Sequence, residues 1–477
     1  MTLHQQKAKM LPLKPLPTES FDVAVVGAGV VGCAIARRFT LEGARVAVIE
    51  KAQDILDGAS KANSAILHTG FDAPPDSLEL SCIRDGYREY AEINREMGLP
   101  LETTSAHVIA WSNDEVARLE HVAAQAITNG IDDIELIDAD ELHRREPDLS
   151  EHALAAVAVP GESIIDPWST PYAYLRQSLE NGGTVILDCN VTGGSFGGDQ
   201  WHLETSRGAL RSRYVINCAG LYGDILDETL LGETKFKIKP RKGQFVVFDK
   251  AAARLVNSIL LPVPTSRTKG IVITRTIFGN VLVGPTAEDQ VSRTDASTDE
   301  ATLRSLITSA AKMIPALGDM PVTAVYAGLR PATEQKDYKI EVHADQNWIT
   351  VGGIRSTGLS GALGIARHVF GLYGERGASL RPIEHPKIPD APLLAENGQR
   401  DWQHEGHGEI VCHCELVTER EIQQALAGPL AARSLSGLKR QTRATMGRCQ
   451  GFYCSARLAE LTEDRFDVPM SLGVDHV

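Results

Sequence analysis

A glycine-rich turn near the start of the sequence limits the possible folds more than any other feature. Residues 21–26 form a valine-rich run that predicts a buried strand, and Gly27-Ala28-Gly29-Val30-Val31-Gly32 follows it directly. A helix-like segment comes next, and a second apolar run ends at Glu50, 18 residues after Gly32. This order of strand, G-x-G-x-x-G turn, helix, strand and acid predicts a βαβ unit that binds a dinucleotide.

Each position of this unit has a physical role. The first glycine permits the tight turn, the second lets the backbone approach a pyrophosphate, and the third lets the helix and strand pack closely. The start of the helix supplies amide donors and a positive dipole, and the acid can accept both ribose hydroxyls. The predicted cofactor-binding residues of the unit are Gly27, Gly29, Val30, Val31, Gly32, Glu50 and Lys51.

The motif alone does not distinguish FAD from NAD. It opens the fold, so no other cofactor site precedes it. The sequence contains no second G-x-G-x-x-G, so a reductase that uses both FAD and NAD(P)H would lack its second site. Both observations favour FAD.

Length and composition set further limits. A chain of 477 residues is too long for one core and predicts two or three domains. The net charge of −14 argues against a nucleic-acid-binding protein. No apolar run approaches the roughly 20 residues that span a bilayer. The polar leader, residues 1–20, lacks the apolar segment of a secretory signal, so we expect a cytoplasmic protein.

Along the rest of the chain the pattern predicts an α/β fold. Strand and helix patterns alternate around residues 161–220 and 348–373, whereas short β-like runs over 235–284 predict antiparallel sheet. Residues 381–408 contain four prolines and predict a stiff linker that holds two domains apart. Residues 409–477 would then form a small separate domain.

Cysteines are distributed unevenly along the chain. Four of the eight are scattered among apolar neighbours and are predicted to be inert core thiols: Cys33, Cys82, Cys189 and Cys218. The other four, Cys412, Cys414, Cys449 and Cys454, have the spacing C-x-C and then C-x4-C. Two close thiolate pairs suit a centre with four sulfur ligands, which leaves zinc or an iron–sulfur cluster.

Two features near these cysteines favour the cluster over zinc. Zinc pairs more often have the spacing C-x2-C. Five cationic residues precede or adjoin the second pair and would offset the negative charge of a cluster: Arg433, Lys439, Arg440, Arg443 and Arg448.

Thr418 and Glu421 form a capping-box pattern, which predicts that a helix starts there.

The sequence resembles two known families. Residues 27–32, 58–60, 63–70, 166–167, 215–220, 279–285, 328–331 and 352–361 follow the order of the D-amino-acid-oxidase-type FAD-dependent oxidoreductases, in particular the glycerol-3-phosphate and L-2-hydroxyglutarate dehydrogenase branch. The four cysteines with their neighbours resemble bacterioferritin-associated-ferredoxin-like 2Fe–2S domains. The large subunit of anaerobic glycerol-3-phosphate dehydrogenase has the same domain order.

The first resemblance implies a Rossmann-like FAD-binding domain, about 21–75, 160–234 and 328–375, with an inserted antiparallel-sheet substrate domain, about 76–159 and 235–327. The second implies a mainly helical 2Fe–2S domain over 409–477. Beyond the βαβ unit, the implied FAD contacts are Ala59, Ser60, Asn63, Ser64, Ala65, Ile66, Val191, Cys218, Ala219, Gly220, Arg330, Gly353, Ile354, Thr357, Gly358 and Leu359.

Arginine is the side chain best suited to anchor an acidic substrate, because its planar fork pairs two oxygens at once. The resemblance implies that Arg330 lies over the flavin. Arg275 resembles part of the Thr-Arg pair of L-2-hydroxyglutarate enzymes, although Val272 stands where that branch has a histidine. Arg355 and Lys269 are weaker candidates.

His68 is the candidate catalytic base, because an imidazole titrates near neutral pH and the residue follows the segment expected beside the flavin. A core histidine bonded to backbone is the alternative. The local motif differs from that of relatives that tether flavin through histidine, so we expect FAD to bind non-covalently.

Together these features predict a dehydrogenase of a small anionic secondary alcohol, glycerol 3-phosphate or a 2-hydroxy acid. A one-electron cluster suits an acceptor such as a quinone, a ferredoxin-like carrier or a partner subunit, and peripheral contact with the inner face of the membrane stays open. The alternatives are an amino- or imino-acid dehydrogenase and a non-catalytic electron-transfer subunit of a larger complex.

Overall fold

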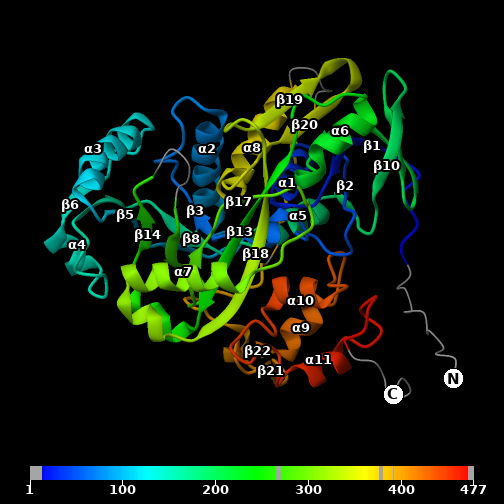
Figure 1. The fold of residues 1–477 in the computed structure, drawn as a ribbon. Coiled ribbons are helices and arrows are strands. Elements are labelled where there is room, and N and C mark those ends of the chain that lie inside the picture. Colours follow the sequence, from blue (N-terminus) through cyan, green and yellow to red (C-terminus); the bar gives the residue numbers. More distant parts are fainter. Residues whose placement is uncertain (1–12, 265–269, 375–379, 390, 471–477) are drawn as a thin grey trace.

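The computed structural model describes residues 13–264, 270–374, 380–389 and 391–470. Two large sheets lie side by side, and a small C-terminal domain packs beneath them (Figure 1). Residues 1–12 of the predicted leader lie outside the described part. None of the helices in these ranges is long and apolar enough to cross a bilayer.

The first sheet has a parallel core in the order β9-β2-β1-β12-β20. Its eight strands are β1 (Ser20–Val26), β2 (Val46–Ile49), β9 (Thr184–Ile186), β10 (Val191–Phe196), β11 (Trp201–Thr205), β12 (Gly208–Asn217), β19 (Lys339–His343) and β20 (Trp348–Gly352). Helix α1 (Val30–Leu41) joins β1 to its parallel neighbour β2. The βαβ unit predicted from the glycine motif is therefore confirmed.

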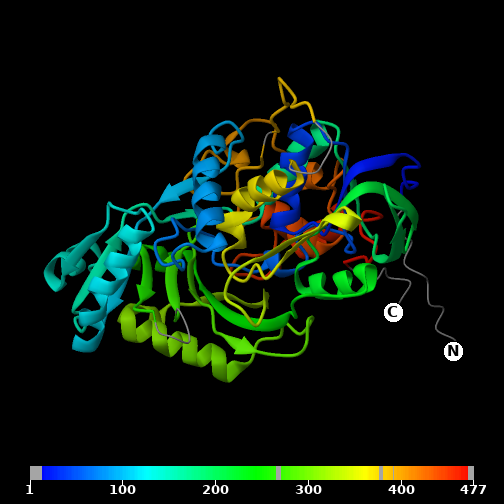
Figure 2. The same cartoon turned by 90° about the horizontal axis from the view of Figure 1, so that it is seen from above.

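Helices cover both faces of this sheet. Helix α1 packs against α5 (Ser169–Glu180) and α8 (Gly358–Gly374), whereas α6 (Gly223–Leu231) contacts β10, β12 and β20. Helix α2 (Leu78–Ile93) lies beside α8, as Figure 2 shows. A Cβ at Gly364 of α8 would lie 2.0 Å from the carbonyl oxygen of Cys82 in α2, so glycine is what allows this close approach.

The second sheet has nine strands, and several come from before residue 160. They are β5 (Ala106–Ala110), β6 (Glu135–Asp138), β7 (Ala155–Val159), β13 (Lys239–Phe248), β14 (Ile259–Pro262), β15 (Val272–Arg275), β16 (Val281–Gly284), β17 (Glu288–Asp289) and β18 (Val322–Ala332). Helices α3 (Asn113–Thr128), α4 (Ala139–Arg145) and α7 (Glu300–Met313) pack on it. The predicted antiparallel pairing holds over 239–284, and the parallel pair β14–β5 joins the two parts of the sheet.

A small three-stranded sheet in the order β3-β8-β4 lies between the two large ones. It consists of β3 (Ile66–Leu67), β8 (Ser163–Ile165) and β4 (Leu101–Thr103). The antiparallel pairs β3–β8 and β8–β4 bring three distant parts of the sequence together. His68 follows β3, and Arg275 forms an ion pair with Glu102 of β4, so two of the candidate catalytic residues adjoin this sheet.

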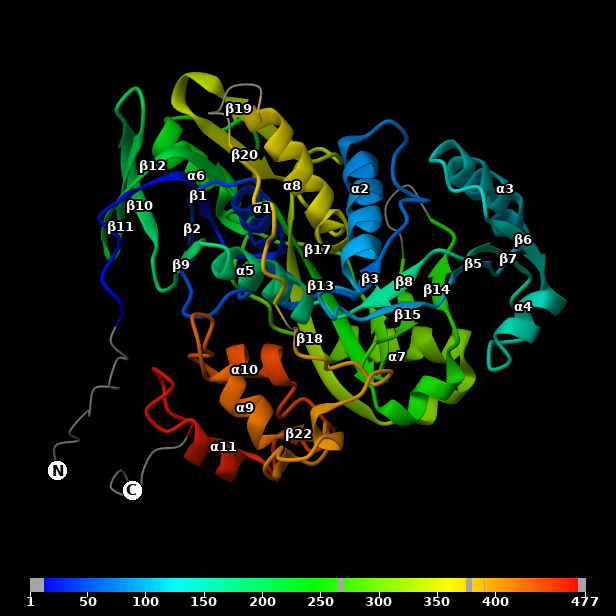
Figure 3. The same ribbon diagram turned by 180° about the vertical axis from the view of Figure 1, so that it is seen from behind.

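The C-terminal domain contains β21 (Ile410–Cys412), β22 (Val417–Thr418), α9 (Glu419–Ala425), α10 (Leu435–Thr442) and α11 (Ser455–Leu461). The predicted capping box is present: Thr418 Oγ1 accepts from the Glu421 amide, and the Glu421 carboxylate accepts from the Thr418 amide. From behind, this domain lies directly against the α5 and β18 region (Figure 3).

The proline-rich segment does not hold the two domains apart as expected. Its Ile383 amide donates to the Leu41 carbonyl at 2.8 Å, and Leu394 and Ala395 are buried in a core of the second sheet. Asp54 accepts from the Arg433 amide and the Ser434 hydroxyl, which ties the C-terminal domain to the first. The segment follows the surface of the protein because its apolar residues are buried in this core.

Candidate active site and cysteine centre

The glycine turn after β1 is built so that only glycine fits at two of its positions. Gly27 has φ +108°, and a Cβ there would lie 2.5 Å from the Cys218 carbonyl oxygen at the end of β12. A Cβ at Gly32 would lie 1.9 Å from the Gly27 carbonyl oxygen. The Val30 amide at the start of α1 donates to Ser60 Oγ at 3.0 Å. The turn, the end of β12 and the 59–61 segment therefore form one cradle at the helix start.

Glu50 stabilises this turn from the end of β2. Its carboxylate accepts from the Ala28 amide at 2.7 Å and from the Ala52 amide at 2.9 Å. Burial raises the pKa of Glu50, and the two amide bonds act in the opposite direction. A carboxylate has about four acceptor positions, so these bonds leave capacity for ribose hydroxyls. Lys51 lies over the Tyr222 ring, 3.4 Å from its centroid.

The segment that joins η1 (Ala59–Lys61) to β3 is tied to the start of α8. Ser360 Oγ donates to the Ile66 carbonyl and accepts from the His68 amide. Asn63 Oδ1 accepts from the Ala65 amide at 2.6 Å, and Ala65 has φ +61°. These bonds shape the backbone that is expected to line the flavin.

The starts of α1 and α8 lie close together. A Cβ at Gly358 would be 4.0 Å from side-chain atoms of both Val30 and Val31. Gly353, in the turn before α8, has φ +67°. The Thr357 hydroxyl, just before α8, lies 2.7 Å from a carboxylate oxygen of Glu79 and 2.7 Å from the Tyr338 hydroxyl. Two helix N-termini, each with a positive dipole, therefore adjoin the cradle, and this arrangement fits an extended dinucleotide. Val191 lies in β10 and, like Ala219, packs against one core cluster of the first sheet.

His68 forms the centre of a polar group beside the small sheet. Its Nδ1 lies 2.8 Å from Glu162 Oε2, and the Glu162 side chain is fully buried. Glu162 Oε1 accepts from both the amide and the hydroxyl of Thr69, at 2.7 and 2.8 Å. The pairing of β3 with β8 places the residue after one strand beside the residue before the other. The imidazole is thus oriented by a carboxylate whose own position is fixed.

Glu162 is a residue that the sequence predictions missed. It is the single acid in the otherwise apolar run 153–165, where an ionisable side chain needs a buried partner. That signal was available, but nothing local to the sequence connects Glu162 to His68.

Arg330 lies in β18 among other guanidinium groups. Its Nη2 donates to the Thr286 carbonyl at 2.5 Å, and a Cβ at Gly243 of β13 would lie 2.1 Å from that nitrogen. Burial, then the positive charges of Arg241 and Arg355, lower the pKa of Arg330 to about 10. An anion placed here would relieve the repulsion, so the position suits an acidic ligand group.

Arg275 has different surroundings. Its Nη2 forms an ion pair of 2.8 Å with Glu102 of β4, so its charge is already compensated by a carboxylate. Arg355 lies 3.8 Å from Glu79. Lys269 falls outside the described residues. Of the two main arginine candidates, Arg330 has the environment that favours an added anion.

Cys412 ends β21 and Cys414 follows it, whereas Cys449 and Cys454 lie in the segment before α11. The thiol of Cys414 interacts with that of Cys449, and the thiol of Cys412 with that of Cys454. Among the described residues, no three or more His, Cys, Asp or Glu side chains lie close enough together to hold a single metal ion. A Cβ at Gly447 would lie 2.2 Å from Cys414 Cβ, so glycine lets the two segments meet.

Backbone amides favour a thiolate at the second cysteine pair. The amide of Tyr453, assisted by those of Gly451 and Phe452, lowers the pKa of Cys449, whereas burial raises the pKa of Cys454 to about 12. Amides that converge on a sulfur suit a cluster ligand, because thiolate-bound iron carries net negative charge. The residues present therefore fit the expected cluster.

Most of the cations near the cysteines have carboxylate partners. The ion pairs are Arg433–Asp467 at 2.8 Å, Arg440–Asp57 at 3.6 Å, Arg443–Glu415 at 2.9 Å and Arg448–Asp249 at 2.6 Å. Carboxylates therefore already compensate much of the positive charge that was expected to offset the cluster, although Arg448 also interacts with the Cys414 thiol, which helps to raise the pKa of Arg448. Lys439 is the one of the five with no carboxylate partner among the described residues.

Three of the four scattered cysteines are core residues, as expected, whereas Cys218 is half-buried. Cys33, Cys82 and Cys189 are at most 1% exposed, and all four are unpaired. Burial is the largest cause that raises the pKa of each thiol, to about 12 for Cys82.

Comparison with known proteins gives a consistent result over nearly the whole chain. Residues 22–372 match the FAD dependent oxidoreductase family model, and residues 410–463 match the BFD-like [2Fe-2S] binding domain. A glycerol 3-phosphate dehydrogenase of Caloramator mitchellensis is 33% identical over 96% of this chain and 97% of its own length. One subunit of the anaerobic glycerol-3-phosphate dehydrogenase of Escherichia coli K12 is 25% identical over 96% of this chain and 91% of its own length.

Among solved structures, the FAD-bound L-alpha-glycerophosphate oxidase of Mycoplasma pneumoniae has a TM-score of 0.73 at 26% identity, covering 79% of this chain and all of that one. The predicted fold class, FAD and the 2Fe–2S cluster are confirmed by these matches, whereas the individual contact residues stay predictions. The chain belongs to the FAD-dependent oxidoreductase family of the D-amino-acid-oxidase type and carries a C-terminal BFD-like 2Fe–2S domain.

Proposed function

We propose that this enzyme oxidises the secondary alcohol of glycerol 3-phosphate and passes the electrons through its 2Fe–2S cluster to a separate acceptor. The observation that carries the substrate is the half-buried Arg330 near Arg241 and Arg355. Asp289 pairs with Arg241 and Glu79 lies 3.8 Å from Arg355, so the three guanidinium groups retain an excess of positive charge, which favours a dianionic phosphate over a single carboxylate. The glycerol 3-phosphate enzymes among the relatives support the same substrate.

The reaction removes a hydrogen with two electrons from the C–H bond and a proton from the hydroxyl, and leaves a ketone. Bound FAD supplies the acceptor for the two electrons. Arg330 and Arg355 hold the phosphate and thereby orient the carbon to be oxidised. His68 takes the hydroxyl proton at Nε2, because the Glu162 carboxylate can only accept a hydrogen bond and so holds the ring proton on Nδ1.

A 2Fe–2S cluster carries single electrons, so it suits delivery to a quinone, a ferredoxin-like carrier or a partner subunit rather than direct reduction of oxygen. The relative named as part of an anaerobic dehydrogenase supports this part of the proposal. A peripheral position at the membrane surface is compatible with each of these three acceptors.

A 2-hydroxy acid is the second candidate substrate. It is favoured by Arg275 and by the L-2-hydroxyglutarate dehydrogenases among the relatives, of which the human enzyme aligns with 57% of this chain. Binding of a carboxylate by Arg275 would require its ion pair with Glu102 to open. Amino and imino acids are further alternatives, since solved amino-acid-oxidising enzymes share the fold.

Anaerobic reduction of the flavin tests these candidates directly. The purified enzyme is mixed with glycerol 3-phosphate, L-2-hydroxyglutarate, L-proline or glycine, and the loss of flavin absorbance is followed. We expect glycerol 3-phosphate to reduce it fastest. Arg330→Lys should raise the substrate concentration for half-maximal rate, whereas Arg304→Lys, at an exposed position of α7, should not. Faster reduction by 2-hydroxyglutarate would overturn the choice of substrate.

A further inference from the structure

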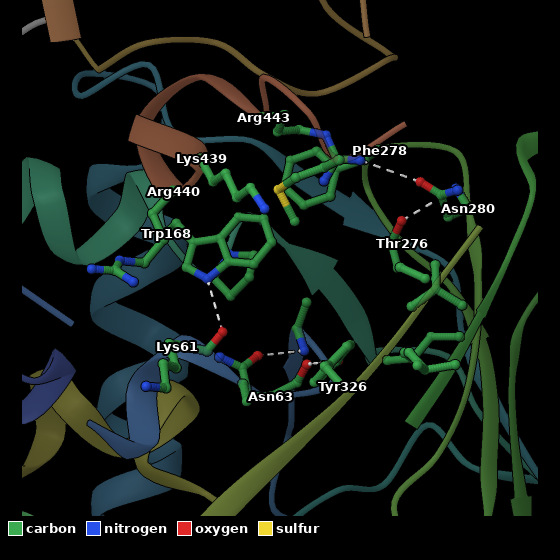
Figure 4. Close-up of a pocket in the computed structure, with 18 of the residues that line it drawn as sticks. Lys61, Asn63, Trp168, Thr276, Phe278, Asn280, Tyr326, Lys439, Arg440 and Arg443 are labelled. Atoms are coloured by element: carbon green, nitrogen blue, oxygen red, sulfur yellow. Dashed lines mark hydrogen bonds between the residues drawn. The ribbon is translucent and has the colours of Figure 1, made fainter. Parts of the chain in front are cut away.

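A cavity of about 350 Å³ lies where the C-terminal domain meets the rest of the molecule (Figure 4), and neither the glycine turn nor Arg330 is among its lining residues. One wall is the 61–65 segment, which includes the expected FAD contacts Asn63 and Ala65. A second wall comes from β13, β16 and β18, and the third from α10 and the 443–450 loop that leads to Cys449. The cavity therefore exists only because the two domains pack together.

Aromatic rings form much of the apolar lining. Trp168 stacks on Phe278 with centroids 5.5 Å apart and planes 13° from parallel. Tyr326 lies on the opposite side, and its hydroxyl donates to the Asn63 carbonyl at 2.9 Å. Flat rings on two sides suit a planar molecule, because stacked rings gain contact over their whole face.

All the charged side chains that line the cavity are positive. Four of the 22 lining residues are cationic, Lys61, Lys439, Arg440 and Arg443, and none is acidic, although the whole chain has a net charge of −14. Such an excess of positive charge in a concave site favours an anion.

Lys439 is the cation best placed to bind that anion. The three other cations have carboxylate partners outside the cavity, Asp57 or Glu415, whereas no hydrogen bond or ion pair holds the Lys439 ammonium group within the described ranges of the chain. Figure 4 shows its side chain ending beside the ring of Trp168. Thr445, which is 5% exposed and also lines the cavity, has a hydroxyl oxygen with no partner among these residues.

We propose that this cavity binds a planar aromatic or quinoid molecule that carries an acidic group, with the ring between Trp168 and Tyr326 and the anionic group at Lys439. The site is separate from the glycerol 3-phosphate site proposed above and does not depend on the identity of that substrate. Its position places the bound ring between the flavin-lining segment and the loop of Cys449.

Isothermal titration of the oxidised holoenzyme with anthraquinone-2-sulfonate tests the proposal. We expect saturable binding at one site per chain. Lys439→Gln should weaken it about tenfold, or about 1.4 kcal/mol. Ala324→Phe, which fills the cavity from a partly exposed position of β18, should abolish binding, and Lys312→Gln, on exposed α7, should leave it unchanged. Melting temperatures of all variants check that they fold.

Three results would overturn the proposal: equal binding to the Lys439→Gln and Lys312→Gln variants, equally tight binding of the neutral 2-(hydroxymethyl)anthraquinone, or equally tight binding of inorganic sulfate. If the native site is filled on purification, heat denaturation should release an anionic aromatic compound besides FAD from the wild type and not from Ala324→Phe. Absence of both probe binding and a released compound would also refute it.

Discussion

The orientation of His68 by Glu162 gives the sharpest test of the catalytic site. Replacing Glu162 with glutamine keeps the shape of a side chain that is fully buried and bonded to His68 Nδ1 and twice to Thr69. The glutamine carbonyl must stay with the two Thr69 donors, because an amide NH₂ cannot accept from them. The NH₂ group then faces Nδ1 and forces it to accept, so the ring proton moves to Nε2.

An imidazole protonated on Nε2 cannot take the substrate proton there. The rate of flavin reduction by glycerol 3-phosphate should therefore fall by about 100- to 1000-fold, which is about 3–4 kcal/mol of activation free energy. The concentration for half-maximal rate should change little, since Glu162 does not contact Arg330 or Arg355, which are proposed to hold the phosphate. Anaerobic stopped-flow measurement of flavin absorbance separates the two quantities.

The matched control is Glu120→Gln, at an exposed position of α3. Thermal unfolding shows whether Glu162→Gln stays folded, with an expected loss of about 1–3 kcal/mol of stability from the weakened buried bonds. A folded Glu162→Gln enzyme that reduces its flavin within about threefold of the wild type would refute the role of His68 as an oriented base.

Three further predictions concern the cluster and the fold. The Cys449→Ser enzyme should lose the iron and sulfide of the cluster but keep FAD. The Cys189→Ser enzyme, changed at a buried cysteine, should keep the cluster and FAD, and metal and flavin analysis would measure these contents. Burial alone would raise the pKa of Asp224, but the ion pair with Arg293 together with two backbone amides lowers it, so the carboxylate stabilises the fold above the unfolded pKa of 3.8 and loses this effect at lower pH. The stability that Asp224→Asn loses in urea unfolding at pH 7 should therefore shrink as the pH falls below about 4; a pH-independent difference would contradict this. Gly364→Ala should cost about 2–4 kcal/mol, because its Cβ would lie 2.0 Å from a carbonyl oxygen of α2, whereas Gly371→Ala in the same helix meets no atom within 4 Å and should be tolerated.

Patterns that act over a few residues could be predicted well. The βαβ unit, the capping box at Thr418 and the burial of Cys33, Cys82 and Cys189 follow from local spacing and apolar runs, and the structure confirms them. The behaviour of the proline-rich segment could not be predicted, since proline stiffens a chain but does not reveal that Leu394 and Ala395 enter a distant core.

The sequence by itself indicated the α/β class through its strand and helix patterns, and it indicated the family and the two cofactors through the order of many short motifs along the chain, none of which was sufficient alone. Only the tertiary structure decided which charges are compensated. Glu162 reaches His68, Glu102 reaches Arg275, and Lys439 reaches no carboxylate in the described chain, across separations that no local pattern records. The physical reason is that Coulomb and hydrogen-bond energies depend on distance in space, which strand pairing and domain packing set.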